Sequence, residues 1–289
     1  MTVTAEPVLV RRRPPGALAR AWGVVRAHAL TAYGVLALAY LFLPVAIVVL
    51  FSFNDPVGRF NYTWEGFTLA NWANPFGVPG LGEAMRTSLE IAALASLVAT
   101  ALGTLIALAL VRYGFRGRGA TNLLLFLPMT SPEIVMGASL LTLFLGLQLT
   151  LGFATIFLAH VMFNISYVVV TVKARLVGFD RHLEEAAMDL GANEWTTFRR
   201  VTLPLIAPGI LAASLLAFAL SIDDFVITYF NSGSTVTFPL FVWGAARVGV
   251  PPQVNVMGSF IFVVAVAAML VNTAYQHRRG KAELAKGAA

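Results

Sequence analysis

Six long apolar runs constrain this chain more than any other feature of its sequence. A helix needs about 20 apolar residues to cross a hydrocarbon core of about 30 Å, because each residue rises about 1.5 Å. Within lipid, every backbone polar group must find a partner inside its own segment. The sequence therefore predicts an all-α membrane protein with six transmembrane helices. The six runs are Leu30–Phe53, Thr87–Val111, Ala120–Gly146, Leu151–Val172, Leu205–Phe230 and Gln253–Ala274.

The composition excludes several other classes of protein. The chain is 58% apolar and 12% charged, whereas soluble domains average roughly 45–50% apolar and 25% charged residues. It has no cysteine and four scattered histidines, so we expect no disulfide, no metal site and no catalytic residue. The net charge is +6, but the positive residues flank apolar runs and form no patch with aromatic residues. We therefore expect no nucleic-acid partner.

The positive residues predict how the chain is oriented in the membrane. Six crossings place 17 of the 20 Lys and Arg residues on one side, and only Arg59, Arg86 and Arg247 on the other. By the positive-inside rule, both termini are then cytoplasmic. The predicted organisation is a basic tail over residues 1–27, a six-helix domain over residues 28–276 and a second tail over residues 277–289. The six-helix domain includes cytoplasmic helices at residues 180–202.

The most informative cytoplasmic segment joins the fourth and fifth apolar runs. Asp180 suits the cap that begins a helix, and Gly191 suits the left-handed residue that ends it. A second short helix is predicted to begin at an Asn193 cap and to end before Pro204. The first helix is acidic and rich in alanine, which favours a groove on another protein over lipid. The alternatives are a loop that covers the ends of its own spans and a helix that rests on lipid.

Three carboxylates lie inside the apolar runs. Glu133 lies near the middle of the third run, directly after Pro132, and Asp223 and Asp224 lie in the outer half of the fifth. A charge at the centre of a membrane helix costs about 2.5–3.5 kcal/mol on insertion scales. We therefore expect these carboxylates to face a polar path, with Pro128 and Pro132 bending the third span. Structural pairing with a neighbouring helix is the alternative.

A short pattern in the cytoplasmic segment carries a family resemblance. Glu185, Ala186 and Ala187 are followed after three residues by Gly191, and after nine more by Val201–Pro204. The pattern resembles the EAA loop of the membrane-spanning subunits of binding-protein-dependent ABC importers. The segments FSFND, RYGFRGR, SPEIVMG and SIDDFVITYF resemble the permeases of spermidine/putrescine importers in particular. The resemblance implies a type I ABC importer permease fold, with a central path shared with a partner subunit.

The resemblance also implies a set of partners in the cytoplasmic membrane of a bacterium. These are two copies of an ABC ATPase subunit, a second permease subunit, an extracytoplasmic substrate-binding protein and membrane lipid. The chain has no GxxxxGK[ST] motif, so we expect ATP and Mg to be used on the ATPase subunit and no cofactor to bind here. The residues implied to couple this chain to the ATPase are Glu184, Glu185, Ala186, Ala187, Gly191, Leu203 and Pro204.

A polyamine cargo fits the acidic and aromatic residues of the predicted path. Carboxylates pair with ammonium groups, and aromatic faces attract cations. The alternatives are an importer of the same type for a ferric ion, an opine or an amino acid-like solute, and a gradient-driven secondary transporter. Secondary transporters often contain inverted repeats, and no repeat is visible here. The residues predicted to line the path are Glu133, Asp223, Asp224, Phe225 and Trp243.

Overall fold

The structure is a computed structural model that describes residues 17–267 and residue 270, with side chains from residue 28 onward. The predicted tail over residues 277–289 and most of the predicted tail over residues 1–27 lie outside these residues. The described part is helical, with one isolated bridge between Asn54 and Phe67. Its helices are α1 (Ala17–Phe51), α2 (Ala70–Ala73), α3 (Leu81–Arg112), α4 (Arg118–Thr130), α5 (Glu133–Gly146), α6 (Phe153–Val177), α7 (His182–Asp189), α8 (Glu194–Thr197), the π-helical segment η1 (Phe198–Thr202), α9 (Leu203–Ile222), α10 (Val226–Asn231), α11 (Phe238–Val248) and the helix Pro252–Ala267.

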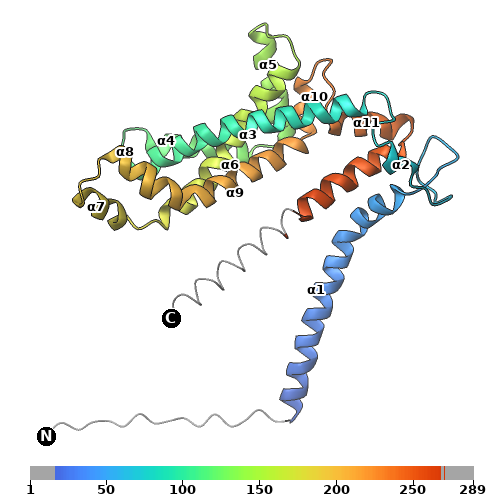
Figure 1. The fold of residues 1–289 in the computed structure, drawn as a ribbon, viewed down its shortest axis with the longest axis horizontal. Coiled ribbons are helices and arrows are strands. Elements are labelled where there is room, and N and C mark those ends of the chain that lie inside the picture. The colour runs from blue at the N-terminus through green and yellow to red at the C-terminus, as the bar shows by residue number, and fades with distance from the viewer. Residues whose placement is uncertain (1–16, 268–269, 271–289) are drawn as a thin grey trace.

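Three long helices form the body of the molecule. Figure 1 shows α3, α6 and α9 running alongside one another, with α7 and α8 at one end and α10 and α11 toward the other. The main apolar core lies among these three helices and contains fully buried Val168, Val172 and Ile206. Small residues let the backbones approach closely, as is common between membrane helices. At Gly103, for example, a Cβ atom would lie 2.6 Å from Val168 Cγ1.

The expectation of six membrane-spanning helices is not confirmed. Four helices of the described residues are long and apolar enough to cross a membrane, namely His28–Phe51, Leu81–Arg112, Phe153–Val177 and Glu194–Ile222. A fifth crossing is counted only if α4 and α5 are taken as one bent span. The sixth predicted run forms the shorter apolar helix Pro252–Ala267, and the remainder of that run contains residues outside the described part.

The third predicted run forms two helices, α4 and α5, and the helix axis bends by 110° between them. The break lies at Ser131, whose φ of −73° and ψ of 139° are extended. Proline disfavours a helical conformation in the residue before it, so Pro132 accounts for the break. Pro128 lies within α4 without ending it. The predicted bend is therefore confirmed at Pro132, and the bend predicted at Pro128 stays a prediction.

The fifth predicted run is also interrupted, and its helix begins before the predicted first residue, Leu205. α9 ends at Ile222, and α10 begins at Val226. At the other end, α8, η1 and α9 follow one another without a break, so the prediction that a short helix ends before Pro204 is wrong. Pro204 lies near the start of α9, directly after a π-helical turn that changes the hydrogen-bond register of the helix.

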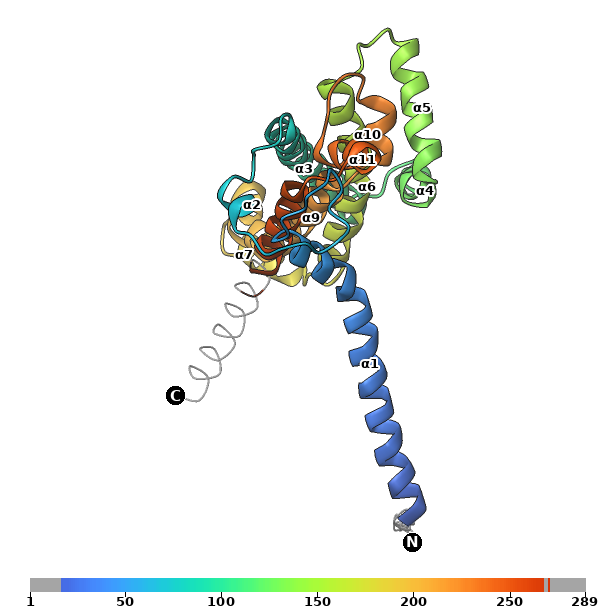
Figure 2. The same ribbon diagram turned by 90° about the vertical axis from the view of Figure 1, so that its right-hand side faces the viewer.

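The first helix stands apart from the body. In Figure 2, α1 extends away from the remaining helices. None of the 18 residues that form its most apolar stretch is buried. A buried hydrogen-bond network joins its end to the loop that follows. Asn54 Nδ2 donates to Asn61 Oδ1 at 2.6 Å, and Asn71 Nδ2 donates to the Asn54 carbonyl at 2.8 Å. This network satisfies the polar groups of a loop that contains little regular structure.

Candidate functional site

The two helix breaks bring the predicted path carboxylates together. Glu133 is the first residue of α5, and Asp223 lies in the break between α9 and α10. α5 and α10 pack against each other, because Gly137 lies against Ile227 and its carbonyl accepts from Asn231 Nδ2 at 3.4 Å. Asp223 consequently lies within electrostatic range of both Glu133 and Asp224. The sequence placed these residues in separate runs and could not show this proximity.

The three carboxylates have different surroundings. Glu133 and Asp223 are exposed, whereas only 7% of the Asp224 side chain is exposed. Asp224 Oδ2 accepts hydrogen bonds from the Thr228 backbone N–H at 2.8 Å and from Thr228 Oγ1 at 2.7 Å. These bonds hold the start of α10. The surroundings of Asp224 thus fit the alternative of structural pairing, whereas the side chains of Glu133 and Asp223 are exposed.

His160 of α6 completes the surroundings of Asp224. Its ring is buried, with Nε2 3.3 Å from Asp224 Oδ2 and 2.9 Å from Thr228 Oγ1. Its Nδ1 lies 2.6 Å from Ser221 Oγ. Because the Thr228 hydroxyl donates to Asp224, its oxygen accepts from Nε2–H, and a neutral ring with one N–H satisfies both contacts. His160 therefore joins three helices by hydrogen bonds.

Aromatic rings gather around Phe225, the residue that follows Asp224 in the chain. The ring centroids of Phe225 and Trp243 are 5.2 Å apart, and those of Phe225 and Tyr229 are 5.6 Å apart. The guanidinium carbon of Arg247 lies 4.7 Å from the centre of the Trp243 ring. Tyr229 and Arg247 are not among the path residues predicted from the sequence. A signal existed for both, since each lies four residues after a predicted path residue and so shares its helix face.

The predicted docking segment has the expected caps. Gly191 has a left-handed φ of +88°, and the N–H of Ala192 donates to the Ala187 carbonyl at 3.1 Å, as in a common helix ending. Asn193 caps α8 by accepting from the Thr196 N–H at 2.8 Å. The predicted cap at Asp180 is displaced by one residue, because α7 begins after Arg181. Asp180 Oδ1 still accepts from the backbone of α7, at 3.0 Å from His182 N.

The residues implied for ATPase coupling do not all face the same way. Glu185, Ala186, Gly191, Leu203 and Pro204 are exposed, and Ala187 is half-buried. Glu184 instead points into the molecule, where it contacts Arg112 and Thr202.

Two large apolar side chains lie open beside them. Leu190 is 90% exposed and Trp195 is 67% exposed. Neither residue is among the coupling residues predicted from the sequence. Large apolar side chains in an acidic, alanine-rich segment could have indicated a contact with another protein. Exposed apolar residues of this size at a helix surface suit contact with another protein.

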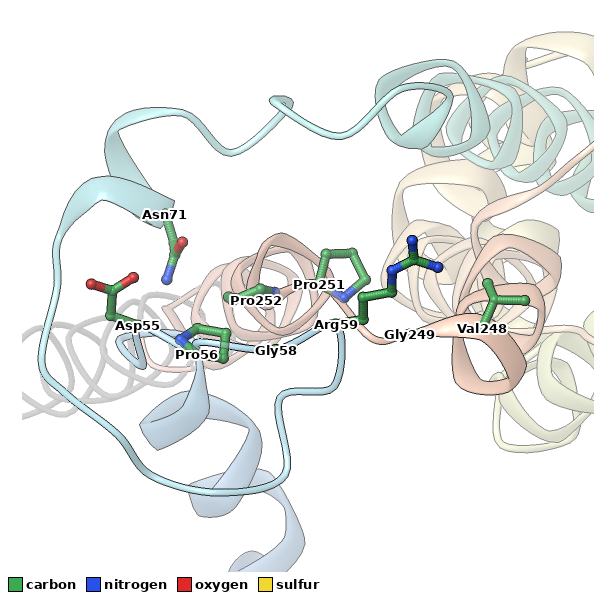
Figure 3. Close-up of a pocket in the computed structure, with 9 residues that line it drawn as sticks. All are labelled: Asp55, Pro56, Gly58, Arg59, Asn71, Val248, Gly249, Pro251 and Pro252. Atoms are coloured by element: carbon green, nitrogen blue, oxygen red, sulfur yellow. The ribbon is translucent and has the colours of Figure 1, made fainter.

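An open hollow of about 420 Å³ lies at the other end of the molecule. Figure 3 shows residues of the loop after α1 facing residues that follow α11 across it. No predicted path residue lines it, so it is separate from the carboxylate site. Its lining residues are Asp55, Pro56, Gly58, Arg59, Asn71, Val248, Gly249, Pro251 and Pro252.

Comparison with known proteins agrees with the arrangement of helices and loops. Residues 99–279 match the family described as "Binding-protein-dependent transport system inner membrane component". Over 81% of its length, the chain is 41% identical to the spermidine/putrescine transport system permease protein PotC of Haemophilus influenzae, covering 91% of that protein. It is 38% identical over 78% of its length to the putrescine transport system permease protein PotI of Escherichia coli, covering 83% of it.

Solved structures share the fold at low sequence identity. A chain of a bacterial ABC transporter involved in the import of the acidic polysaccharide alginate aligns with a TM-score of 0.63 and 15% identity. The alignment covers 90% of this chain and 99% of that one. The predicted importer fold is therefore confirmed, although its six membrane helices are not. By family match and by relatives along most of its length, the chain belongs to the inner membrane components of binding-protein-dependent transport systems.

Proposed function

We propose that this chain is the permease subunit of an ABC importer for polyamines and forms half of the path for spermidine or putrescine. The observation that carries the proposal is the pair of exposed carboxylates Glu133 and Asp223, which lie at two helix breaks. Phe225 follows Asp223 by two residues, and its ring centroid lies 5.2 Å from that of Trp243. Carboxylates and aromatic faces are the groups that bind ammonium ions. The names of the relatives PotC and PotI support the same cargo.

The proposed complex contains the partners implied by the family. Two ATPase subunits bind ATP and Mg and dock on α7 and α8, a second permease completes the path, and an extracytoplasmic binding protein delivers the cargo. This arrangement requires α7 and α8 in the cytoplasm, and with six crossings both termini lie there too, as the distribution of positive residues predicts. The exposed Leu190 and Trp195 support a protein contact at the docking segment. This chain supplies no catalytic residue in the proposed mechanism.

Transport by the reconstituted complex tests the cargo. The chain, its partner permease, the ATPase and the binding protein are placed in proteoliposomes, and uptake of radiolabelled spermidine and putrescine is measured with and without ATP. We expect ATP-dependent uptake of a polyamine. Uptake of ferric ion or of an amino acid in its place would refute the proposed cargo while keeping the importer. Uptake that depends on an ion gradient and not on ATP would refute the importer itself.

Substitutions test the path. Removing one charge-assisted hydrogen bond costs about 1.5–3 kcal/mol, so Glu133→Gln or Asp223→Asn should weaken polyamine uptake roughly tenfold or more. Glu83→Gln is the matched control, because Glu83 is also an exposed carboxylate in the first turn of a helix but lies outside the site. Equal uptake by all three variants would remove both carboxylates from the path.

A further inference from the structure

Three polar side chains from separate segments meet where the docking segment joins the body. Arg112 is the last residue of α3, Glu184 lies in the first turn of α7 and Thr202 is the last residue of η1. Arg112 forms an ion pair with Glu184, and Thr202 Oγ1 donates to the same carboxylate oxygen. Arg112 Nη2 also donates to Thr202 Oγ1 at 3.4 Å. We call Arg112, Glu184 and Thr202 the coupling triad.

The coupling triad is largely closed to water. Only 13% of the Glu184 side chain and 24% of the Arg112 side chain are exposed, and Thr202 is fully buried. The neighbouring Glu185 pairs with His182 at the surface, with 61% and 86% of the two side chains exposed. Separating a buried ion pair leaves unpaired charges and is costly, whereas a surface pair contributes little. The triad therefore resists being pulled apart.

The coupling triad is the polar attachment of α7 to α3. α7 contains no buried residue, and its backbone lies against α8 and η1. α3, by contrast, packs along α6 and α9 and is about 48 Å long by its 32 residues. Near its far end, Ser88 Oγ accepts from the N–H of Phe238, which begins α11. One rigid helix thus connects the docking segment to the helix that bears Trp243.

We propose that the coupling triad passes movement of the docking segment to α3. Arg112 and Glu184 are then positioning residues, because they act through α3 and touch no solute. The proposal rests on the proposed function, in which α7 and α8 dock on the ATPase. When the ATPase subunits close and displace α7, the buried ion pair makes α3 follow. The π-helical turn that holds Thr202 fits this place, because such turns are frequent at functional sites.

Charge removal tests the proposal in the reconstituted complex. Arg112→Gln and Glu184→Gln are made singly and together, and solute imported per ATP hydrolysed is measured alongside the amount of ATPase that co-purifies. We expect each single variant to keep the ATPase bound and to lower uptake per ATP about tenfold, within the usual range of coupling between sites. The double variant should be no worse than either single one, because both remove the same link. Arg86→Gln, which breaks the exposed pair with Glu90, is the control.

A reversible cross-link separates transmission from simple folding. Because the chain has no cysteine, Arg112→Cys with Glu184→Cys introduces its only two thiols. A short linker that joins the two thiols through disulfide bonds should restore uptake per ATP, and reducing those disulfide bonds should abolish it again.

Two outcomes would overturn the coupling triad. One is that Arg112→Gln imports as much solute per ATP hydrolysed as the wild type. The other is that cross-linking the two cysteines does not restore the solute imported per ATP. A wild-type complex that binds no ATPase would instead refute the proposed function. The two failures are therefore distinguishable.

Discussion

Asp223 and Asp224 are neighbours in the chain but have different surroundings. Asp223 is exposed near Glu133, whereas Asp224 is held by Thr228 and lies beside His160. The difference arises because the Asp224 side chain faces His160 of α6 and Thr228 of α10, while the Asp223 side chain is exposed. In sequence the two residues are equivalent, and both were predicted to line the path. The path role of Asp223 stays a prediction, whereas Asp224 contacts residues of α6 and α10.

The buried contacts of Asp224 predict a loss of stability when its side chain is removed. Asp224→Ala leaves the buried Thr228 hydroxyl and the Thr228 backbone N–H without their acceptor, and each unsatisfied group costs about 1–3 kcal/mol. We therefore expect a clear fall in the thermal denaturation midpoint of the purified protein in detergent. Asp223→Ala is the matched control, and it should change stability by no more than about 0.5 kcal/mol, as exposed substitutions do. Equal midpoints for the two variants would contradict the structural role of Asp224.

A second prediction concerns Gly191. A left-handed φ costs a residue with a Cβ about 1–2 kcal/mol, although no neighbouring atom lies within 4 Å of a Cβ built here. Gly191→Val should therefore insert into the membrane normally but disturb the end of α7, lowering uptake per ATP hydrolysed. Gly191→Asn should be milder, because asparagine tolerates this conformation. Fully coupled uptake by the valine variant would remove Gly191 from the coupling residues.

At the scale of elements, the interruptions of the helices determine where the site lies. α4 and α5 bend apart at Pro132, and α9 and α10 separate at Asp223. Because α5 packs on α10, both breaks expose a carboxylate at one place. A straight third helix would keep Glu133 in the middle of a span, whereas the sequence predicted a span that bends at its prolines. The proline signal was visible in the sequence, but the angle and the helix packed on it were not.

Packing between α3 and α6 gives a prediction at this scale. Gly103→Ala places a Cβ 2.6 Å from Val168 Cγ1 and 2.8 Å from Val168 Cβ, so the two helices must move apart. Overpacking of this kind costs about 1–3 kcal/mol, and we expect a lower denaturation midpoint. Gly146→Ala is the control, since Gly146 is also helical but has no atom within 4 Å of a Cβ. It should be neutral or slightly stabilising.

At the scale of the whole molecule, the body places the two proposed surfaces at opposite ends of its long helices. α7 and α8 lie at one end, and α10 and α11 lie toward the other (Figure 1). A docking movement at one end must therefore travel along α3, α6 or α9 to reach the carboxylate site. This separation matches a permease that receives energy on one side of a membrane and a solute on the other.

The orientation of the whole chain can be tested by cysteine labelling. Gly58→Cys lies in the loop after α1 and Arg116→Cys in the loop between α3 and α4, and both positions are exposed. By the positive-inside rule, a membrane-impermeant maleimide should label position 58 in intact cells and position 116 only after permeabilisation. The absence of native cysteine in this chain makes the labelling specific. The reverse pattern would invert the proposed topology.

The sequence by itself determined the features that depend on neighbouring residues. These are the apolar runs, the sign of the charge on their flanks, the caps at Gly191 and Asn193 and the EAA-like pattern. Each is local, because it depends on a helix period or on a single backbone conformation. The same local information located the acidic residues of the site but not their roles.

Only the tertiary structure decided how those residues are used. His160 holds Asp224 from 64 positions away in the chain, and Arg112 turns Glu184 inward from 72 positions away. Whether a carboxylate is paired or open depends on which helices pack beside it, and no local pattern contains that information. The exposed pair Glu133 and Asp223 and the coupling triad therefore arise from the packing of distant segments, on helices that the sequence had largely predicted.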